Sequence, residues 1–135
     1  MIVVDTNIIS YFYLNSERSA IAEQAFQKDP WWVAPLLWKS EFRNILSMYI
    51  RKEIIDLSDA MRIITISEEL FRENEYEVNS FQVLKLAKIS GCSAYDCEFV
   101  SLAKDLGLPL LTEDKKILAH FPETALSMAD FLVQK

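Results

Sequence analysis

The stretch Met1-Ile2-Val3-Val4-Asp5-Thr6-Asn7 decides the fold. Ile2 to Val4 form an unbroken run of β-branched residues, which predicts a strand buried on both faces, as in a parallel sheet. Asp5 follows at once, and a helix-like apolar run begins at Ile8. Because open α/β sheets bind ligands beyond the carboxyl ends of their strands, Asp5 stands where a site is expected. A cap on the following helix explains an aspartate here equally well.

The length and net charge of the chain restrict the number of domains and the classes of function that we expect. The chain has 135 residues, so we expect one domain spanning residues 1–135. Hydrophobic residues make up 51%, which is enough for a core. The net charge of −6 argues against a protein that coats duplex DNA with a basic face. It leaves open a nucleic-acid enzyme that uses metal ions as its positive charge, and it suits a basic partner.

Several familiar kinds of site are excluded. Cys92, Cys97 and the single His120 lack zinc-site spacing, and we expect two reduced cysteines in a cytoplasmic protein. Two glycines are too few for a P-loop or a dinucleotide fingerprint. One histidine excludes a metal-free ribonuclease mechanism that needs two imidazoles. No apolar stretch approaches the roughly 18 residues of a membrane span. The chemistry must therefore come mainly from carboxylates.

Strands and helices are predicted to alternate along the chain. Further strands are expected at 31–34, 75–78, 108–112 and 125–126, and helices at 17–27, 36–52, 58–72, 81–89, 94–106, 115–119 and 128–133. This pattern predicts the α/β class, a three-layer α/β/α sandwich with a short, mostly parallel central sheet. The helices from Ser58 to Ile89 are expected to project as an arm in the middle of the chain. Leu84 and Tyr95 are expected on buried helix sides.

Three more acids stand out in their local patterns. Glu41 lies on the apolar stripe of the helix at 36–52, where a carboxylate is costly unless it is paired or binds a metal. Pairing with a lysine or arginine is the alternative there. Asp114, like Asp5, follows an apolar strand and precedes a helix, so that a cap is its alternative. Asp96 lies in the first turn of a helix, where an acid also favours the helix dipole.

A central first strand would let these four acids face one cleft. Two of them lie at strand ends and two on helices. Four carboxylates gathered in one pocket repel each other strongly without cations. Mg²⁺ and Mn²⁺ prefer such oxygen ligands, and one or two bound ions activate a water and stabilise charge on a phosphoryl oxygen. The acids therefore indicate a metal-dependent phosphodiesterase.

Four short segments carry a family resemblance, and each contains one of the acids. They are Val4-Asp5-Thr6-Asn7, Ser40-Glu41-Phe42-Arg43-Asn44, Ala94-Tyr95-Asp96-Cys97 and Leu111-Thr112-Glu113-Asp114. In order and spacing they resemble the signature segments of PIN-domain ribonucleases. The chain length and the stretch 101–112 are similar to the VapC-type toxins of toxin–antitoxin pairs. The resemblance covers nearly the whole chain, except that no motif matches about 54–89.

The resemblance implies a divalent-metal-dependent endoribonuclease whose water attacks the RNA phosphodiester, leaving a 5′-phosphate and a 3′-hydroxyl. One or two Mg²⁺ or Mn²⁺ ions would be held by Asp5, Glu41, Asp96 and Asp114. Thr6 and Thr112 would orient ligands or water, and Asn7 would support the cluster. The resemblance also implies a homodimer and a cognate antitoxin that inserts a segment, often with a basic side chain, into the acidic cleft.

Neighbouring charged residues have competing explanations. Lys115 and Lys116 follow the last acid and are candidates for contact with RNA phosphate, although a solvated helix start explains them as well. Arg43 is expected to point away from the cleft, because two positions correspond to about 200° round a helix. Glu98 is a better candidate for a fifth cleft acid than Glu113.

Other classes of function remain open. A PIN-like fold that has lost catalysis would act as a binding or scaffold module, but the presence of all four acids weighs against it. A metal-dependent nuclease acting on other nucleic acids is a further alternative. A phosphatase of the haloacid type needs a second aspartate two residues after the first, where this chain has Asn7. A response-regulator receiver usually has an acidic pair before its phosphorylated aspartate, and none occurs here.

Overall fold

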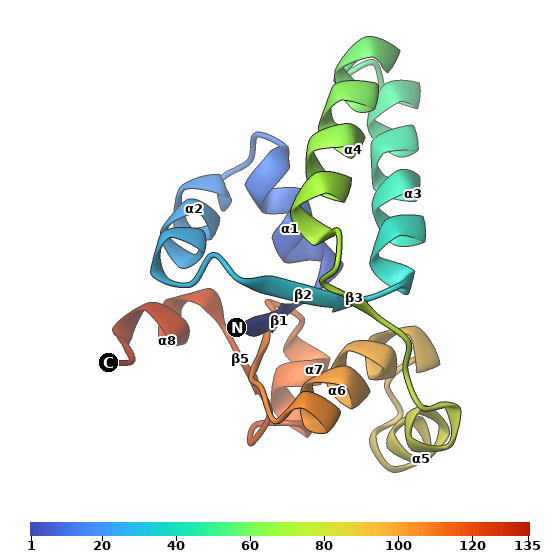
Figure 1. Ribbon diagram of the computed structural model, residues 1–135, viewed down its shortest axis with the longest axis vertical. Coiled ribbons are helices and arrows are strands. Elements are labelled where there is room, and N and C mark those ends of the chain that lie inside the picture. Colours follow the sequence, from blue (N-terminus) through green and yellow to red (C-terminus); the bar gives the residue numbers. More distant parts are fainter.

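A five-stranded parallel sheet lies at the centre of the computed structural model, which describes residues 1–135 (Figure 1). The strands are β1 (Ile2–Val4), β2 (Trp32–Pro35), β3 (Glu75–Tyr76), β4 (Leu110–Leu111) and β5 (Ala125–Leu126). Their order is β3-β2-β1-β4-β5, so β1 is the central strand. The predicted α/β fold with a short parallel sheet is confirmed.

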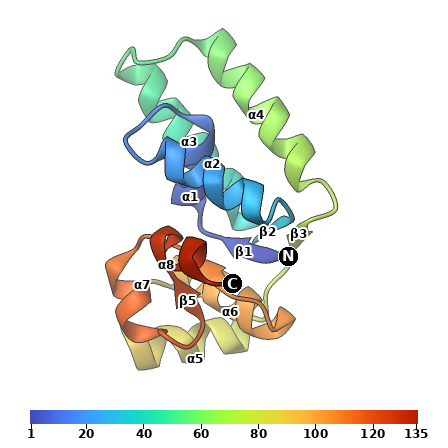
Figure 2. The ribbon, with the colours of Figure 1, turned by 90° about the vertical axis from the view of Figure 1, so that its left-hand side faces the viewer.

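Helices cover both faces of the sheet (Figures 1 and 2). One face carries α1 (Thr6–Tyr13), α2 (Ser19–Lys28), α3 (Leu37–Arg51) and α4 (Leu57–Phe71). The opposite face carries α5 (Ser80–Ser90), α6 (Ala94–Leu106) and α7 (Lys115–His120), while α8 (Met128–Val133) packs against α2. None of these helices combines the length and hydropathy needed to cross a membrane.

The central strand is apolar because both of its faces are covered. Ile2, Val3 and Val4 are at most 1% exposed, and Leu110 and Leu111 of the neighbouring β4 are fully buried. A strand sandwiched between two helical layers has no solvent face, so polar alternation is absent. These strands belong to one cluster of 31 buried apolar residues, which holds the two helical layers on the sheet.

A helical arm is present, but only one of its two helices lies in the predicted segment. α3 and α4 pack against each other and extend away from the sheet (Figures 1 and 2). The first helix predicted for the arm belongs to it as α4, but the second, α5, does not, because β3 separates α4 from α5. Glu75 and Tyr76 pair with β2, and the chain then crosses to the other face, where α5 packs along α6.

Candidate active site

The carboxyl ends of β1 and β4 meet where the strand order reverses. The chain places β2 and β3 on one side of β1, and β4 and β5 on the other. Connections that leave in opposite directions open a crevice at this edge of a sheet. Asp5 follows β1, and its backbone N–H donates to the carbonyl oxygen of Leu111 in β4 at 3.0 Å. The ladder thus brings Asp5 beside the segment that leads to Asp114.

All four predicted acids line one cleft at this edge, with a volume of about 210 Å³. Its lining residues are Asp5, Thr6, Asn7, Glu41, Asn44, Ile45, Asp96 and Asp114. The acids come from four separate parts of the chain: the end of β1, the second turn of α3, the first turn of α6 and the residue before α7. A single hydrophobic residue, Ile45, is among the lining. The cleft is therefore polar and rich in carboxylates.

Two threonine hydroxyls hold two of the acids. The buried Thr112 Oγ1 donates to Asp5 Oδ2 at 2.7 Å and accepts from the backbone N–H of Asp114 at 3.0 Å. Thr6 Oγ1 donates to Glu41 Oε1 at 2.7 Å. A hydroxyl has one proton to donate, so each bond orients a carboxylate while leaving its other oxygen available. These are the contacts that a supporting role for Thr6 and Thr112 requires.

Capping explains one strand-end acid and not the other. Asp5 precedes α1 but makes no side-chain capping hydrogen bond to it. Asp114 does cap α7, since its Oδ1 accepts from the backbone N–H groups of Lys116 and Ile117, both at 2.9 Å. Its Oδ2 makes no hydrogen bond within the protein. Asp114 therefore combines a structural role with a free carboxylate oxygen beside the cleft.

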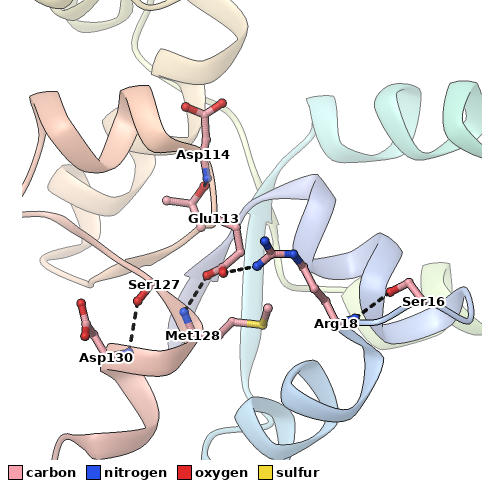
Figure 3. Close-up of polar contacts among 8 residues, drawn as sticks. Ser16, Arg18, Glu113, Asp114, Ser127, Met128 and Asp130 are labelled. Carbon is pink, nitrogen blue, oxygen red and sulfur yellow. Dashed lines mark hydrogen bonds and ion pairs between the residues drawn. The ribbon is translucent and has the colours of Figure 1, made fainter.

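Glu113 points away from its neighbour Asp114 (Figure 3). Its carboxylate pairs with Arg18 at 2.6 Å and accepts from the backbone N–H of Met128 at 2.8 Å. One carboxylate oxygen thus contacts the residue before α2, and the other contacts the first residue of α8. The expectation that Glu113 lies outside the cleft is confirmed, since it is absent from the lining.

Among the cleft acids, Asp5 has the pKa that burial and neighbouring charges raise most. Burial raises the pKa of this carboxyl to about 6, from 3.8 for an unperturbed aspartate. The hydrogen bond from Thr112 opposes the rise, and the charges of Glu41 and Asp96 add to it. Since Asp5 is 8% exposed, water screens these charges poorly. Ionisation of Asp5 therefore lowers the stability of the folded protein.

The other acids repel in the same way. Burial is the largest cause of the raised pKa of Glu41, and the charges of Asp96 and Glu98 raise this pKa further. Burial likewise raises the pKa of Asp96, with the charge of Asp114 adding and that of Lys116 opposing. Glu98 does not line the cleft, although it contributes to the negative charge around it. A bound cation would relieve this repulsion.

The residues suit a hard divalent cation by their chemistry. All four acids offer carboxylate oxygens, the ligands that Mg²⁺ and Mn²⁺ prefer. As the side chains stand, no three histidine, cysteine, aspartate or glutamate groups lie close enough together to hold one ion. Glu41 and Asp96 are only partly buried, so their side chains have room to rotate toward a shared ion. Coordination by several of the acids therefore requires such rotation.

A second hollow has both acidic and basic residues in its lining. It is larger, about 390 Å³, and is lined by Lys39, Thr65, Glu68, Glu69, Arg72, Glu73 and Glu75. Here lysine and arginine lie among the acids, and Lys39 pairs with Glu75 at 3.4 Å. The cleft beside Asp5 has no lysine or arginine in its lining. Both linings contain four acids, but only the second hollow also contains two basic residues, so the cleft beside Asp5 is the more negative of the two.

Two lining residues, Asn44 and Ile45, were not predicted. Asn44 lies three positions after Glu41 in α3, and residues three apart share a helix face. Helical spacing was thus a signal that would have found Asn44. Arg43 lies outside the cleft, as predicted, and pairs with Glu68 at 3.9 Å.

The two lysines after Asp114 differ from each other. Lys115 is exposed and makes no side-chain hydrogen bond or ion pair. Lys116 donates from Nζ to the carbonyl oxygen of Gly91 at 2.6 Å. Neither lines the cleft itself. Contact of either lysine with RNA stays a prediction.

A family model described as the PIN domain matches residues 2–123, which include all four cleft acids. The chain belongs to the PIN-domain family. The resemblance seen in the four sequence segments is therefore confirmed. A curated relative of this PIN domain, ribonuclease VapC3 from Pyrobaculum aerophilum, is 31% identical over 126 residues, covering 90% of this chain and 95% of its own.

Solved structures share the fold of this PIN domain. The crystal structure of PAE2754 from Pyrobaculum aerophilum has a TM-score of 0.76 and 23% identity, covering 97% of this chain and 92% of its own. A toxin–antitoxin complex from Klebsiella pneumoniae has a TM-score of 0.71 and 16% identity, covering 95% and 98%. FitAcB from Neisseria gonorrhoeae has a TM-score of 0.70 and 16% identity, covering 96% and 99%.

Proposed function

We propose that this PIN domain is a divalent-metal-dependent endoribonuclease and the toxin component of a type II toxin–antitoxin system. The observation that carries the proposal is the convergence of Asp5, Glu41, Asp96 and Asp114 on one cleft in a member of this family. The curated relative is named a ribonuclease, and one of the structural neighbours is described as a toxin–antitoxin complex. Both support the proposal.

The proposal gives each cleft residue a task. Asp5, Glu41, Asp96 and Asp114 would hold one or two Mg²⁺ or Mn²⁺ ions. Such an ion, when bound, lowers the pKa of a water and stabilises charge on a phosphoryl oxygen. Thr112 and Thr6 each donate one hydrogen bond, to the Asp5 and Glu41 carboxylates respectively, and would help to orient them. Asn7 lies exposed in the cleft lining, where its amide would support the cluster or meet the substrate.

The substrate would be RNA, cleaved by water to leave a 5′-phosphate and a 3′-hydroxyl. An acidic protein needs cationic groups to receive a polyanion, and here the bound ions would supply most of that charge. Lys115, with its free ammonium one residue from Asp114, is the protein group best placed to meet a flanking phosphate. Lys116 would be the weaker of the two phosphate contacts, because its ammonium is already bonded to the carbonyl oxygen of Gly91.

The test compares cleavage of a generic RNA in Mg²⁺ or Mn²⁺ with cleavage in EDTA. Asp96→Asn should lower the rate by more than about 100-fold. Loss of a group that hydrogen-bonds to a metal ligand costs up to about 100-fold, and loss of a metal ligand itself should cost more. Asp105→Asn is the matched control, since Asp105 is an exposed aspartate of the same helix with no side-chain partner. Undiminished cleavage in EDTA, or by Asp96→Asn, would refute the proposal.

Two further arms separate the alternatives. A single-stranded DNA of the same sequence tests for a nuclease that acts on other nucleic acids, and equal cleavage of both would favour it. A wild-type protein that binds Mn²⁺ but cleaves neither polymer would favour the catalytically inactive binding or scaffold module.

We also propose the partners that the resemblance implied: a cognate antitoxin and a second copy of the chain. Large apolar side chains stand exposed on α4 (Leu57, Met61, Ile66) and on α5 (Phe81, Leu84, Ile89), as is usual for interaction surfaces. Light scattering tests the homodimer. Growth arrest on expression, relieved by co-expression of a small neighbouring open reading frame, tests the antitoxin.

Two broader expectations accompany these. We propose that residues 1–135 form a single PIN-like domain, since the buried apolar residues form one cluster. We propose a cytoplasmic location, where the free, buried Cys92 and Cys97 would stay reduced.

A further inference from the structure

Lys116 connects α7, which Asp114 caps, to the loop that precedes the helix carrying Asp96. Its backbone N–H donates to Asp114 Oδ1 at 2.9 Å, so its main chain is tied to one acid. Its side chain reaches the carbonyl oxygen of Gly91 at 2.6 Å, twenty-five residues earlier in the chain. Gly91 ends α5 in the left-handed conformation with φ of 72°, which a glycine adopts without strain. The ammonium thus holds the loop between α5 and α6.

That loop leads directly into the first turn of α6, which carries Asp96. Ser93 accepts the backbone N–H of Asp96 at 3.0 Å and so begins α6. The Cys92 N–H donates to Ser90 Oγ at 3.0 Å. The remaining hydrogen bonds of residues 91–93 are made within α5 and α6, so the bond from Lys116 is the one that joins this loop to α7.

We propose that Lys116 is a positioning residue that sets the separation of Asp96 and Asp114, and thereby the affinity of the cleft for a divalent cation. This inference rests on the proposed metal-dependent function. It assigns Lys116 to the arrangement of the acids instead of to the binding of RNA phosphate.

Two opposing effects of Lys116 on a bound cation differ in size. Its positive charge repels the cation, but the side chain is exposed, and solvent limits such an effect to about fivefold in affinity. Groups that hydrogen-bond directly to metal ligands typically change metal affinity or activity by about 10- to 100-fold, and the Lys116 ammonium acts on Asp96 through the loop at 91–93, so the lower end of this range applies. Positioning therefore outweighs repulsion, and removal of the ammonium should weaken cation binding.

The experiment uses three variants of the full chain. Lys116→Met keeps the length of the side chain and removes its charge and donors, whereas Lys116→Arg keeps both. Lys85→Met is the control, because Lys85 is an exposed lysine on α5 without a side-chain partner. Hydrogen exchange of the peptide spanning residues 90–97 is measured in EDTA. Mn²⁺ affinity is measured from the EPR signal of free Mn²⁺, without RNA.

The expected result for Lys116→Met is faster exchange of that peptide and Mn²⁺ binding weakened by about tenfold. Lys116→Arg should restore most of the affinity, and Lys85→Met should match the wild type. In RNA cleavage at a Mn²⁺ concentration near the wild-type Kd, Lys116→Met should lower kcat at saturating RNA while KM changes little, since a phosphate contact would raise KM instead.

Each other outcome overturns a stated claim. Unchanged exchange and Mn²⁺ affinity in Lys116→Met, or tighter Mn²⁺ binding, would overturn the positioning role while leaving the proposed nuclease intact. A wild type that binds no Mn²⁺ would overturn the proposed metal site, and the inference about cation affinity would fall with it. The two failures are distinguished by the wild-type titration.

Discussion

Replacement of Asp5 by asparagine should stabilise the metal-free protein above neutral pH. Burial raises the pKa of Asp5 to about 6 from 3.8, so the folded state resists ionisation of this carboxyl. A raised pKa in an acid lowers the free energy of unfolding as pH rises from about 3.8 to about 6, and the cost is complete above pH 6. Asparagine resembles the neutral acid and still accepts the hydroxyl bond from Thr112, so it avoids this cost.

The size of the effect follows from the two pKa values. By linkage, the variant should be more stable than the wild type by about 0.5 kcal/mol at pH 4 and by about 3 kcal/mol at pH 7.5, apart from an offset that is the same at both. Urea unfolding in EDTA, followed by the fluorescence of the buried Trp32 and Trp38, measures both free energies. Mn²⁺ should raise the stability of the wild type and have less effect on the variant.

Asp105→Asn is the control for this titration, since Asp105 is exposed and makes no side-chain bond. Its stability should follow that of the wild type at both pH values. If the difference in the free energy of unfolding between Asp5→Asn and the wild type does not grow between pH 4 and pH 7.5, ionisation of Asp5 does not destabilise the folded protein. The electrostatic argument for a cation at this site would then fail.

Further predictions concern the groups around the acids. Thr112→Val removes the buried hydroxyl that donates to Asp5 and should lower the free energy of unfolding by about 1–3 kcal/mol in urea titrations, whereas Thr112→Ser should restore it. Thr6→Val should raise the pKa of Glu41 further, because the Thr6 hydroxyl lowers it, and an NMR titration of the Glu41 carboxyl carbon in EDTA would show no change if the bond is unimportant. Lys115→Met should raise KM for RNA, leave kcat unchanged and reduce the slope of log affinity against log salt by about 1; an unaltered slope would argue against a phosphate contact.

Local pattern predicted most of the individual elements. The helix at 94–106 and the helix at 128–133 have the predicted bounds, because a serine cap begins each and, for the first, Gly107 ends it. Such signals act within one helical turn, so they can be recognised without knowledge of the fold. The apolar run of β1 likewise indicates burial on both faces.

Burial on the outer helices was less predictable. Leu84 and Tyr95 were expected to be buried, but they are 64% and 63% exposed. Helical periodicity shows which residues share a face, and it does not show how far a neighbouring helix extends over that face. Whether α5 or α3 would join α4 in the arm also depended on β3, whose two residues give a weak pattern alone.

By itself, the sequence determined an α/β fold with a buried first strand and four acids that break or end apolar patterns. These features are local, because each depends on residues within a few positions of one another. Only the tertiary structure decided that β1 lies between β2 and β4, which brings the four acids to one cleft. It also decided the bonds from Thr112 to Asp5 and from Lys116 to Gly91. Such contacts join residues far apart in the chain, and they depend on strand order and side-chain direction, which no short stretch encodes.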